Sequence, residues 1–174
     1  MQIPTARFRD LRTWLGALLA VAALAALPAR GSAQSMFESF AYANKCMDVY
    51  QGNLSDGNHV DVYSCQSSVN QYFQRLSDGH VVVQKGQTGP SGYQMCLDYY
   101  PSNGSVGSPV KIWPCHPIST PSDTQHWYYL GSSQWMGASG NCISAPSGTN
   151  GTQLVMAACN PSNPPANTRW KQRF

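Results

Sequence analysis

The sequence of 174 residues is short of charge and lacks the apolar periodicity of long helices. Asp and Glu together number 8 and Lys and Arg 11, so only 11% of the residues are charged. Beyond residue 35 no sustained apolar pattern occurs at helical spacing, whereas Gly, Ser, Asn, Pro and aromatic residues are plentiful. This composition favours many short strands joined by turns, and we expect an all-β domain.

The long apolar run of the sequence lies near its N-terminus, from Trp14 to Leu27. Three arginines precede the run, and small residues follow it at positions 31–33. This order of basic, apolar and small residues is typical of a secretory signal peptide, and we expect 1–33 to be removed after Ala33. A single membrane span is the alternative, but the run is short for a hydrocarbon core of about 30 Å and Pro28 ends it.

Removal of this segment changes the charge of the chain. Four of the 11 basic residues but only one of the 8 acidic residues lie before residue 34, so the formal +3 falls to zero. We therefore expect neither nucleic acid nor a membrane surface as a partner, and no membrane span after cleavage. The mature chain, residues 34–174, is expected to be secreted or periplasmic and to form one domain.

The mature chain contains six cysteines but no Cys-x-x-Cys pair and no histidine at ligand spacing, so we expect no metal ion and no cofactor. An even number of cysteines in a small exported domain indicates disulfides. Six cysteines allow fifteen pairings, and their number alone does not choose among them. The six are Cys46, Cys65, Cys96, Cys115, Cys142 and Cys159.

The cysteines form three brackets with separations of 19, 19 and 17 residues, and the opening cysteines recur after 50 and then 46 residues. Such a period indicates an internal repeat. We place repeat one at about 37–86, repeat two at about 87–136 and repeat three at about 137–174. An apolar and then a short polar residue follow each opening cysteine: Cys46-Met47-Asp48, Cys96-Leu97-Asp98 and Cys142-Ile143-Ser144.

The residues before each closing cysteine alternate in character, which predicts a strand with two different faces. Five and three positions before the cysteine the residue is large and apolar in every repeat, so we expect that face in the core. The intervening residues should face solvent, and they are polar or aromatic in the first two repeats and bland in the third. The inward set is Val60, Val62, Val110, Ile112, Leu154 and Met156, and the outward set is Asp61, Tyr63, Lys111, Trp113, Val155 and Ala157.

A third signature follows each bracket: Gln71-Tyr72-Phe73, Gln125-His126-Trp127 and Thr168-Arg169-Trp170. We interpret the final aromatic residues as core, one per repeat, and the two glutamines as structural, because a buried amide needs partners. Asp56-Gly57 and Asp78-Gly79 suit tight hairpins. Three such repeats would share one apolar centre around a pseudo-threefold axis.

The combined pattern of Cys-x-Asp, an aromatic residue two positions before the closing cysteine, and Gln-x-Trp resembles the ricin B-type lectin family over about residues 37–174. Bacterial members of that family are also classed as carbohydrate-binding modules. The resemblance implies a β-trefoil with disulfides 46–65, 96–115 and 142–159. It also implies up to one site per repeat for galactose or another sugar.

Carried onto repeat one, the resemblance implies that Asp48 accepts hydrogen bonds from sugar hydroxyls and that Tyr63 stacks on the sugar ring. Asn70, directly before Gln71, would add a contact, and we count both Gln71 and its counterpart Gln125 among the sugar-binding residues. Asp61 stands where the family often has glutamine. It accepts hydrogen bonds only when ionised, which bears on the sugar preference.

In repeat two the same positions hold Asp98, Trp113 and Gln125, with Thr124 in place of the asparagine. Lys111 replaces the usual amide and would donate to a hydroxyl or to an acidic sugar. We expect a second site here.

In repeat three Ser144 and Ala157 remove both the acceptor and the stacking platform, and Asn167 alone does not make a site. We therefore expect this copy to be structural.

Two other classes of function remain as alternatives to a carbohydrate-binding lectin. A non-catalytic trefoil scaffold, or a toxin-binding or inhibitor-like protein subunit without sugar affinity, would use Asp48 and Asp98 as turn formers only. Against this alternative, repeat three is expected to form the same fold with Ser144 in place of the aspartate and Ala157 in place of the aromatic residue. The aspartates and aromatic residues of the first two repeats are therefore not needed for folding alone. The partners expected of a lectin are glycans, and by analogy alone a separate catalytic or toxin subunit.

An enzyme is the less favoured alternative. Asp48 and Asp61 could be imagined as the carboxylate pair of a glycosidase. However, the mature chain has a single Glu and scattered histidines, and it shows no serine or cysteine nucleophile pattern. We expect no catalysis.

Overall fold

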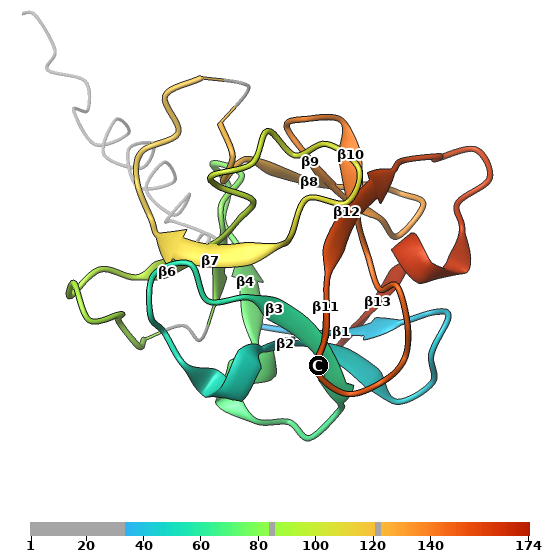
Figure 1. The fold of residues 1–174 in the computed structure, drawn as a ribbon, viewed down its shortest axis with the longest axis horizontal. Helices are drawn as coiled ribbons and strands as arrows, with labels where there is room; N and C mark the ends of the chain where they lie inside the picture. Colours follow the sequence, from blue (N-terminus) through green and yellow to red (C-terminus); the bar gives the residue numbers. More distant parts are fainter. Residues whose placement is uncertain (1–33, 84–85, 121–122) are drawn as a thin grey trace, which may run out of the picture. The chain divides into compact units, whose positions relative to one another are not determined.

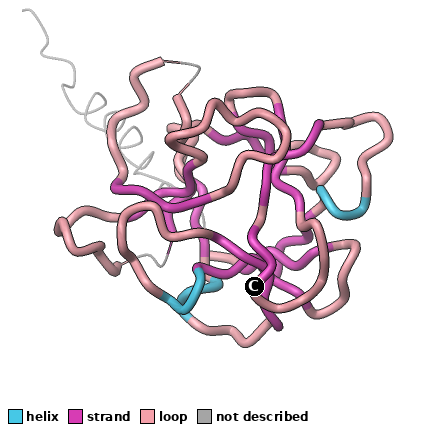
Figure 2. Tube along the Cα trace, viewed as in Figure 1, coloured by secondary structure: helices cyan, strands magenta, loops and turns pink. Residues whose placement is uncertain are grey.

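The computed structural model describes residues 34–83, 86–120 and 123–174. Within these ranges the chain forms short antiparallel strands, long connecting loops and three single-turn 3-10 helices, without an α-helix (Figures 1 and 2). None of the described residues forms a helix able to cross a membrane. The expected signal peptide lies outside the described residues.

The strands form three sheets, and each sheet contains the cysteine-bracketed hairpin of one repeat. The first sheet has the order β11-β3-β2-β1-β13, so it joins the first and last strands of the domain and includes a strand from repeat three (Figure 1). Its members are β1 (Met36–Ser39), β2 (Lys45–Val49), β3 (Val60–Ser64), β11 (Thr152–Gln153) and β13 (Trp170–Arg173).

The other two sheets have four strands each, in the orders β4-β5-β6-β7 and β12-β10-β9-β8. The first comprises β4 (Phe73–Arg75), β5 (Val81–Val83), β6 (Met95–Asp98) and β7 (Lys111–Pro114). The second comprises β8 (Trp127–Tyr129), β9 (Trp135–Gly137), β10 (Asn141–Ser144) and β12 (Val155–Ala158). The 3-10 helices are η1 (Tyr50–Gly52), η2 (Val69–Gln71) and η3 (Ala166–Thr168).

Each opening cysteine is bonded to the closing cysteine of its own repeat, so the pairing 46–65, 96–115 and 142–159 is confirmed. In every case the disulfide links the strand that carries the Cys-x-Asp or Cys-x-Ser motif to the end of the strand hydrogen-bonded to it. The second residue after each opening cysteine is thereby held near the end of a strand.

A closed ring of backbone hydrogen bonds joins the three repeats. The N–H of Val60 donates to the carbonyl of Val110 (3.1 Å), that of Val110 to Leu154 (2.9 Å), and that of Leu154 back to Val60 (2.8 Å). These residues occupy the same place in each repeat, five positions before the closing cysteine. The ring therefore has the pseudo-threefold symmetry that the sequence repeats predict.

Three glycines, each eight positions before a closing cysteine, extend this ring. Gly57, Gly107 and Gly151 all have positive φ, between 77° and 90°, a conformation that glycine adopts most readily. Each donates its N–H to the apolar strand of another repeat, at Ile112, Met156 and Val62, over 2.8–2.9 Å.

Of the two expected tight hairpins, only the one at Asp78-Gly79 forms. Gly57 lies in the long connection 50–59 between β2 and β3, so the prediction of a tight hairpin at Asp56-Gly57 was wrong. At this position the glycine of the Asp-Gly pair makes a hydrogen bond to another repeat instead. At Asp78-Gly79 a tight turn does join β4 to β5, with the N–H of Gly79 donating to the carbonyl of Leu76.

The predicted core is confirmed in all three repeats. The six inward residues of the closing strands and the aromatic residues Phe73, Trp127 and Trp170 are all at most 1% exposed. The indole of Trp127 donates to the carbonyl of Leu97 and that of Trp170 to Ile143, each the residue between the opening cysteine and the motif's polar residue. Phe73 fills the same place in repeat one without a donor.

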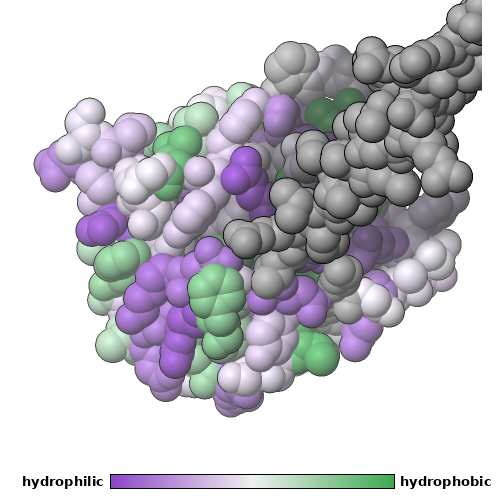
Figure 3. All heavy atoms as spheres, turned by 180° about the vertical axis from the view of Figure 1, so that it is seen from behind, coloured by the Kyte–Doolittle hydropathy of each residue, from purple (hydrophilic) through white to green (hydrophobic). Residues whose placement is uncertain are grey.

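Large apolar side chains are also exposed at scattered positions. On the face seen in Figure 3, the described green side chains are interspersed with purple and white ones. Single exposed apolar residues are normal on a protein surface. Three of them, however, belong to two cavities described next: Tyr50, Tyr63 and Tyr100.

Candidate functional site

A cavity of about 570 Å³ lies in repeat one, where β2 ends and η1 begins. It brings together four of the five predicted residues of this repeat, Asp48, Asp61, Tyr63 and Asn70. We call it the first cavity. Its other lining residues are Tyr50, Gln51, Gln66, Ser68, Asn150 and Gly151.

Asp48 lines the first cavity and is held there by two amide side chains. Its carboxylate accepts hydrogen bonds from the amide of Asn70 to both oxygens, at 2.7 Å each, and from Gln71 to Oδ2 at 2.8 Å. Burial raises the pKa of Asp48, and the two amide donors counteract part of that rise. A carboxylate has about four lone-pair sites, so these three accepted hydrogen bonds leave acceptor capacity for a ligand.

Gln71 itself does not line the cavity. Its fully buried amide donates to Asp48 and to the carbonyl of Ser64 (2.9 Å), and its carbonyl oxygen accepts from the N–H of Gln66 (2.8 Å). Gln71, counted among the expected sugar-binding residues, therefore acts in this structure as a structural amide and does not reach the cavity. It ties the acceptor carboxylate to the end of β3.

Asp61 lies on the same face of its strand as Tyr63, as the alternation predicts, but it is not exposed to solvent. It was expected to face solvent, but it is only 1% exposed and lies directly opposite Asp48 in the β2–β3 register. The reason is that η1 and a loop of repeat three cover this face of the strand. Tyr50 of η1 and Asn150 of that loop line the same cavity as Asp61. The alternation identifies the two faces of a strand but not what covers each of them.

The environment of Asp61 is electrostatically unfavourable. Burial, and then the negative charge of Asp48, raise the pKa of Asp61 to about 7. Its Oδ1 atom is buried and has no hydrogen-bond partner. An unpaired buried carboxylate oxygen is costly, so this position favours a proton or a donor supplied by a ligand.

Two tyrosines form the rim of the first cavity. Tyr63 is 38% exposed and Tyr50, which stacks on His59 with ring centroids 4.3 Å apart, is 36% exposed. Tyr63 was predicted as a platform, whereas Tyr50 was missed. The missed signal is an aromatic residue two positions after the aspartate, found in both Asp48-x-Tyr50 and Asp98-x-Tyr100.

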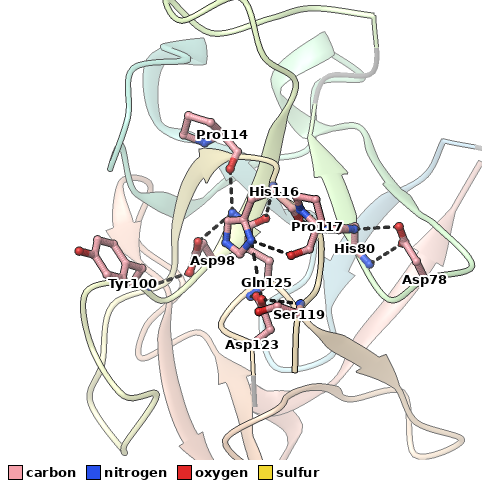
Figure 4. A network of polar contacts seen from close by, with 10 residues as sticks. All are labelled: Asp78, His80, Asp98, Tyr100, Pro114, His116, Pro117, Ser119, Asp123 and Gln125. Atoms are coloured by element: carbon pink, nitrogen blue, oxygen red, sulfur yellow. Dashed lines mark hydrogen bonds and ion pairs between the residues drawn. The ribbon is translucent and has the colours of Figure 1, made fainter. Parts of the chain in front are cut away.

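A smaller cavity of about 230 Å³, the second cavity, lies at the equivalent place in repeat two. The predicted residues Asp98 and Trp113 line it. The carboxylate of Asp98 accepts from the Gln125 amide (3.0 Å) and from the backbone N–H of Tyr100 (2.7 Å) (Figure 4). Its lining residues are Asp98, Tyr100, Trp113, Pro114, His116 and Thr124.

Gln125 reproduces the contacts of Gln71. Besides Asp98, its amide reaches the carbonyl of Pro114 (3.0 Å), and its oxygen accepts from the N–H of His116 (3.2 Å) (Figure 4). Gln125, also counted among the expected sugar-binding residues, is likewise fully buried and does not line the second cavity. His116, whose carbonyl contacts Nε2 of His80 at 2.8 Å, lines the second cavity and was not predicted there.

The platform of the second cavity is braced differently from Tyr63. The indole N–H of Trp113 donates to the carbonyl of Tyr100 (3.1 Å), and the two rings meet edge to face with centroids 5.3 Å apart. Lys111 pairs with Asp98 in the β6–β7 register, but it is not among the lining residues of the second cavity.

Repeat three presents no carboxylate at the equivalent place. Ser144 is buried there and accepts a hydrogen bond from Asn167 at 3.1 Å. Thr168 stands in for the glutamine and accepts from Gln134 at 2.8 Å. Ala157 occupies the platform position.

Comparison with known proteins identifies the fold. The family described as the ricin-type beta-trefoil lectin domain matches residues 36–172. The chain belongs to this family. The predicted family and the β-trefoil fold are thereby confirmed, and the matched region is a lectin domain. A comparison with curated protein sequences gave no significant match.

Several solved structures share the fold of this lectin domain. The agglutinin from Abrus precatorius has 20% sequence identity and a TM-score of 0.65, with 85% of this chain and 51% of that chain covered. A non-toxic homologue of type II RIPs from Momordica charantia, solved with α-methyl-D-galactoside, has 22% identity and a TM-score of 0.63, with 82% and 48% covered. This chain thus spans about half the length of both.

An animal lectin matches over nearly its whole length. The C-half of the earthworm R-type lectin, solved with GalNAc, has 12% identity and a TM-score of 0.61, with 80% of this chain and 96% of that chain covered. At these levels of identity the likeness shows the fold.

Proposed function

We propose that this lectin domain is a secreted carbohydrate-binding protein that holds galactose-like sugars in repeats one and two. The observation that carries the proposal is the recurrence of one constellation. In both repeats a glutamine amide holds an aspartate at the base of a cavity, beside a partly exposed aromatic side chain. In repeat three the aspartate and the aromatic residue are replaced together.

This constellation suits the chemistry of a sugar. Sugar hydroxyls donate hydrogen bonds to a carboxylate, and each bond to a charged group contributes about 1.5–3 kcal/mol. The C–H face of the ring packs on an aromatic side chain. Because both partners lose water, we expect a dissociation constant of about 0.1–1 mM for a monosaccharide at one site. Two sites on one rigid domain would strengthen binding to multivalent glycans.

Two related structures support the choice of sugar class. The Momordica charantia homologue is in complex with α-methyl-D-galactoside, and the earthworm lectin half is in complex with GalNAc. In this chain the acceptor aspartates, Asp48 and Asp98, are supplied by the same motif position in repeats one and two. We therefore take galactose and its 2-amino derivatives as the first sugars to test.

Secretion is part of the proposal. Three disulfides suggest a location outside the cytoplasm, because thiols are kept reduced inside most cells. The basic, apolar and small-residue order of 1–33 supports export by a signal peptide cleaved after Ala33. N-terminal sequencing of the exported protein tests this directly: a mature chain beginning at Gln34 supports it, and retention of the apolar run contradicts it.

A glycan array with the purified, disulfide-bonded protein tests the binding function. We expect signals on glycans that end in galactose-like sugars, lost in a variant carrying both Asp48→Ala and Asp98→Ala. Absence of binding to every glycan, with all three disulfides formed, would overturn the proposal. Release of reducing sugar from a polysaccharide would favour an enzyme instead.

A further inference from the structure

The first and second cavities differ in the residue that faces the acceptor aspartate across the hairpin. Asp61 lies opposite Asp48 in repeat one, whereas Lys111 lies opposite Asp98 in repeat two. Directly opposed residues in an antiparallel pair have Cβ atoms about 4.5–5.5 Å apart, and like charges there repel. At this pair of positions repeat one therefore has two carboxylates that both line its cavity, whereas repeat two has one carboxylate and a lysine that does not line the second cavity.

Among the residues that the structure describes, no cationic side chain forms an ion pair with the two carboxylates of the first cavity. The ion pairs found among the described residues involve the carboxylates of Glu38, Asp78 and Asp123, and none includes Asp48 or Asp61. The lining residues of the first cavity include neither Lys nor Arg. The negative charge of the two carboxylates is therefore available to a cationic ligand that enters the cavity.

The unpartnered Oδ1 atom of Asp61 adds a second, independent indication. Asp61 is 99% buried, it lines the first cavity, and this oxygen accepts no hydrogen bond. Rotation about the last torsion of an aspartate is soft, so its two oxygens exchange places readily. The carboxylate is consequently available to a donor that approaches between Asp48 and Asp61.

We infer that repeat one prefers a sugar bearing a free, protonated amine, a hexosamine, over the corresponding neutral or N-acetylated sugar. This inference rests on the proposed sugar-binding function and specifies its ligand class for one site. A primary ammonium group has three donors and no acceptor, so one group can reach both carboxylates. A hydroxyl has a single donor and no charge. Tyr50 and Tyr63 on the rim offer π faces, which attract cations.

The titratable groups around Asp61 determine how this preference depends on pH. Asp48 faces it from β2, and Tyr50 faces the cavity from η1 with His59 stacked behind it. β11, on the other side, contributes the uncharged Gln153. Lys45 bonds Asn150 at the edge of the cavity, and Lys111 is bridged to His59 on the far side.

Since the pKa of Asp61 is about 7, a cationic ligand competes with a proton at this carboxylate. Affinity for the hexosamine should therefore rise between pH 5 and pH 7, while affinity for the neutral sugar should not rise with it. At pH 5 the hexosamine amine is already protonated, so the change reports on the protein.

The test compares galactosamine, N-acetylgalactosamine and galactose by calorimetry or NMR titration at pH 7. The Asp98→Asn variant serves as the parent, so that repeat one alone is read. We expect galactosamine to bind about tenfold more tightly than galactose, the difference between a charge-assisted and a neutral hydrogen bond. Adding Asp61→Asn should bring the ratio of the two dissociation constants close to one.

The outcomes separate this inference from the proposed function. Equal binding of galactose and galactosamine at pH 7 would overturn the amine preference and leave the lectin function standing. Binding of no sugar would overturn both. If Ca²⁺ at millimolar concentration abolished the galactosamine preference while enhancing galactose binding, the carboxylate pair would be a metal site and the inference would be wrong. A melting temperature for each variant shows that it is folded.

Discussion

Repeats one and two share a scaffold but differ in how they surround their aspartate. In repeat one Asp48 is fixed by two amide side chains and faces a second buried carboxylate, Asp61. In repeat two Asp98 is fixed by one amide side chain and one backbone N–H, and Lys111 pairs with it in the register. The glutamine and the disulfide thus define the place of a site, whereas the residue across the hairpin determines the charge opposite its aspartate in the register.

The largest effect should come from removing both acceptors. The double variant Asp48→Ala, Asp98→Ala should lose all measurable sugar binding, at least a hundredfold, because each carboxylate makes charge-assisted hydrogen bonds of about 1.5–3 kcal/mol. Of the single variants, Asp48→Ala should lose more avidity on a glycan-coated surface. A larger loss from Asp98→Ala would show that repeat two contributes more to binding than repeat one.

Stability at alkaline pH should distinguish Asp61 from other aspartates. The pKa of Asp61 rises from 3.8 to about 7 on folding, so the folded state binds this proton more tightly than the unfolded state. Stability is therefore lost as the pH rises from about 4 to about 7. Asp61→Asn should raise the free energy of unfolding by about 2–4 kcal/mol at pH 8 and by little at pH 4, at ~1.4 kcal/mol per pKa unit.

Denaturant unfolding at both pH values checks this prediction. The matched control is Asp56→Asn, which changes an exposed aspartate preceding the same strand. If Asp61→Asn raised the free energy of unfolding equally at pH 4 and pH 8, the buried charge of Asp61 would not be the cause of the increase.

The two platforms should respond differently to truncation. Tyr63→Ala should weaken binding in repeat one about tenfold with little change in stability, because the ring is 38% exposed. Trp113→Ala should weaken repeat two similarly and also destabilise the fold by about 0.5–1.5 kcal/mol, because its indole donates to the Tyr100 carbonyl. Titration of each variant together with its thermal melt separates the two effects, and equal destabilisation would contradict this difference.

The smallest effect is expected in repeat three. Ser144→Ala removes the hydrogen bond from Asn167 and should cost about 0.5–1 kcal/mol of stability. Sugar binding should not change. Reduced glycan binding in this variant would show that repeat three has a site after all.

The scaffold was predictable from the sequence because its determinants are local and repeated. Alternation before each closing cysteine placed Val60, Val110 and Leu154 in the core, and the structure buries all three completely. The disulfide pairing followed from the family resemblance and was confirmed. The positions of Asp48 and Asp98 in two cavities also follow from their motif.

The remaining features depend on contacts between repeats, which the alternation does not report. Asp61 is buried because η1 and a loop of repeat three wall its face of the strand. Gly57 donates to repeat two instead of closing a tight hairpin. Tyr50 and Tyr100 each follow an aspartate by two positions. This spacing indicates a cavity-lining role only when the path of the chain after the aspartate is known.

An NMR titration with the best-binding galactoside tests the central claim most directly, that two of the three repeats hold sugar. We predict that the backbone signals of Asp48 and Tyr63 and the indole signal of Trp113 shift in two saturating steps. The signals of Ser144 and Ala157 should stay unchanged. Shifts of equal size in repeat three, or no shift in repeat one, would contradict sugar binding by repeats one and two alone.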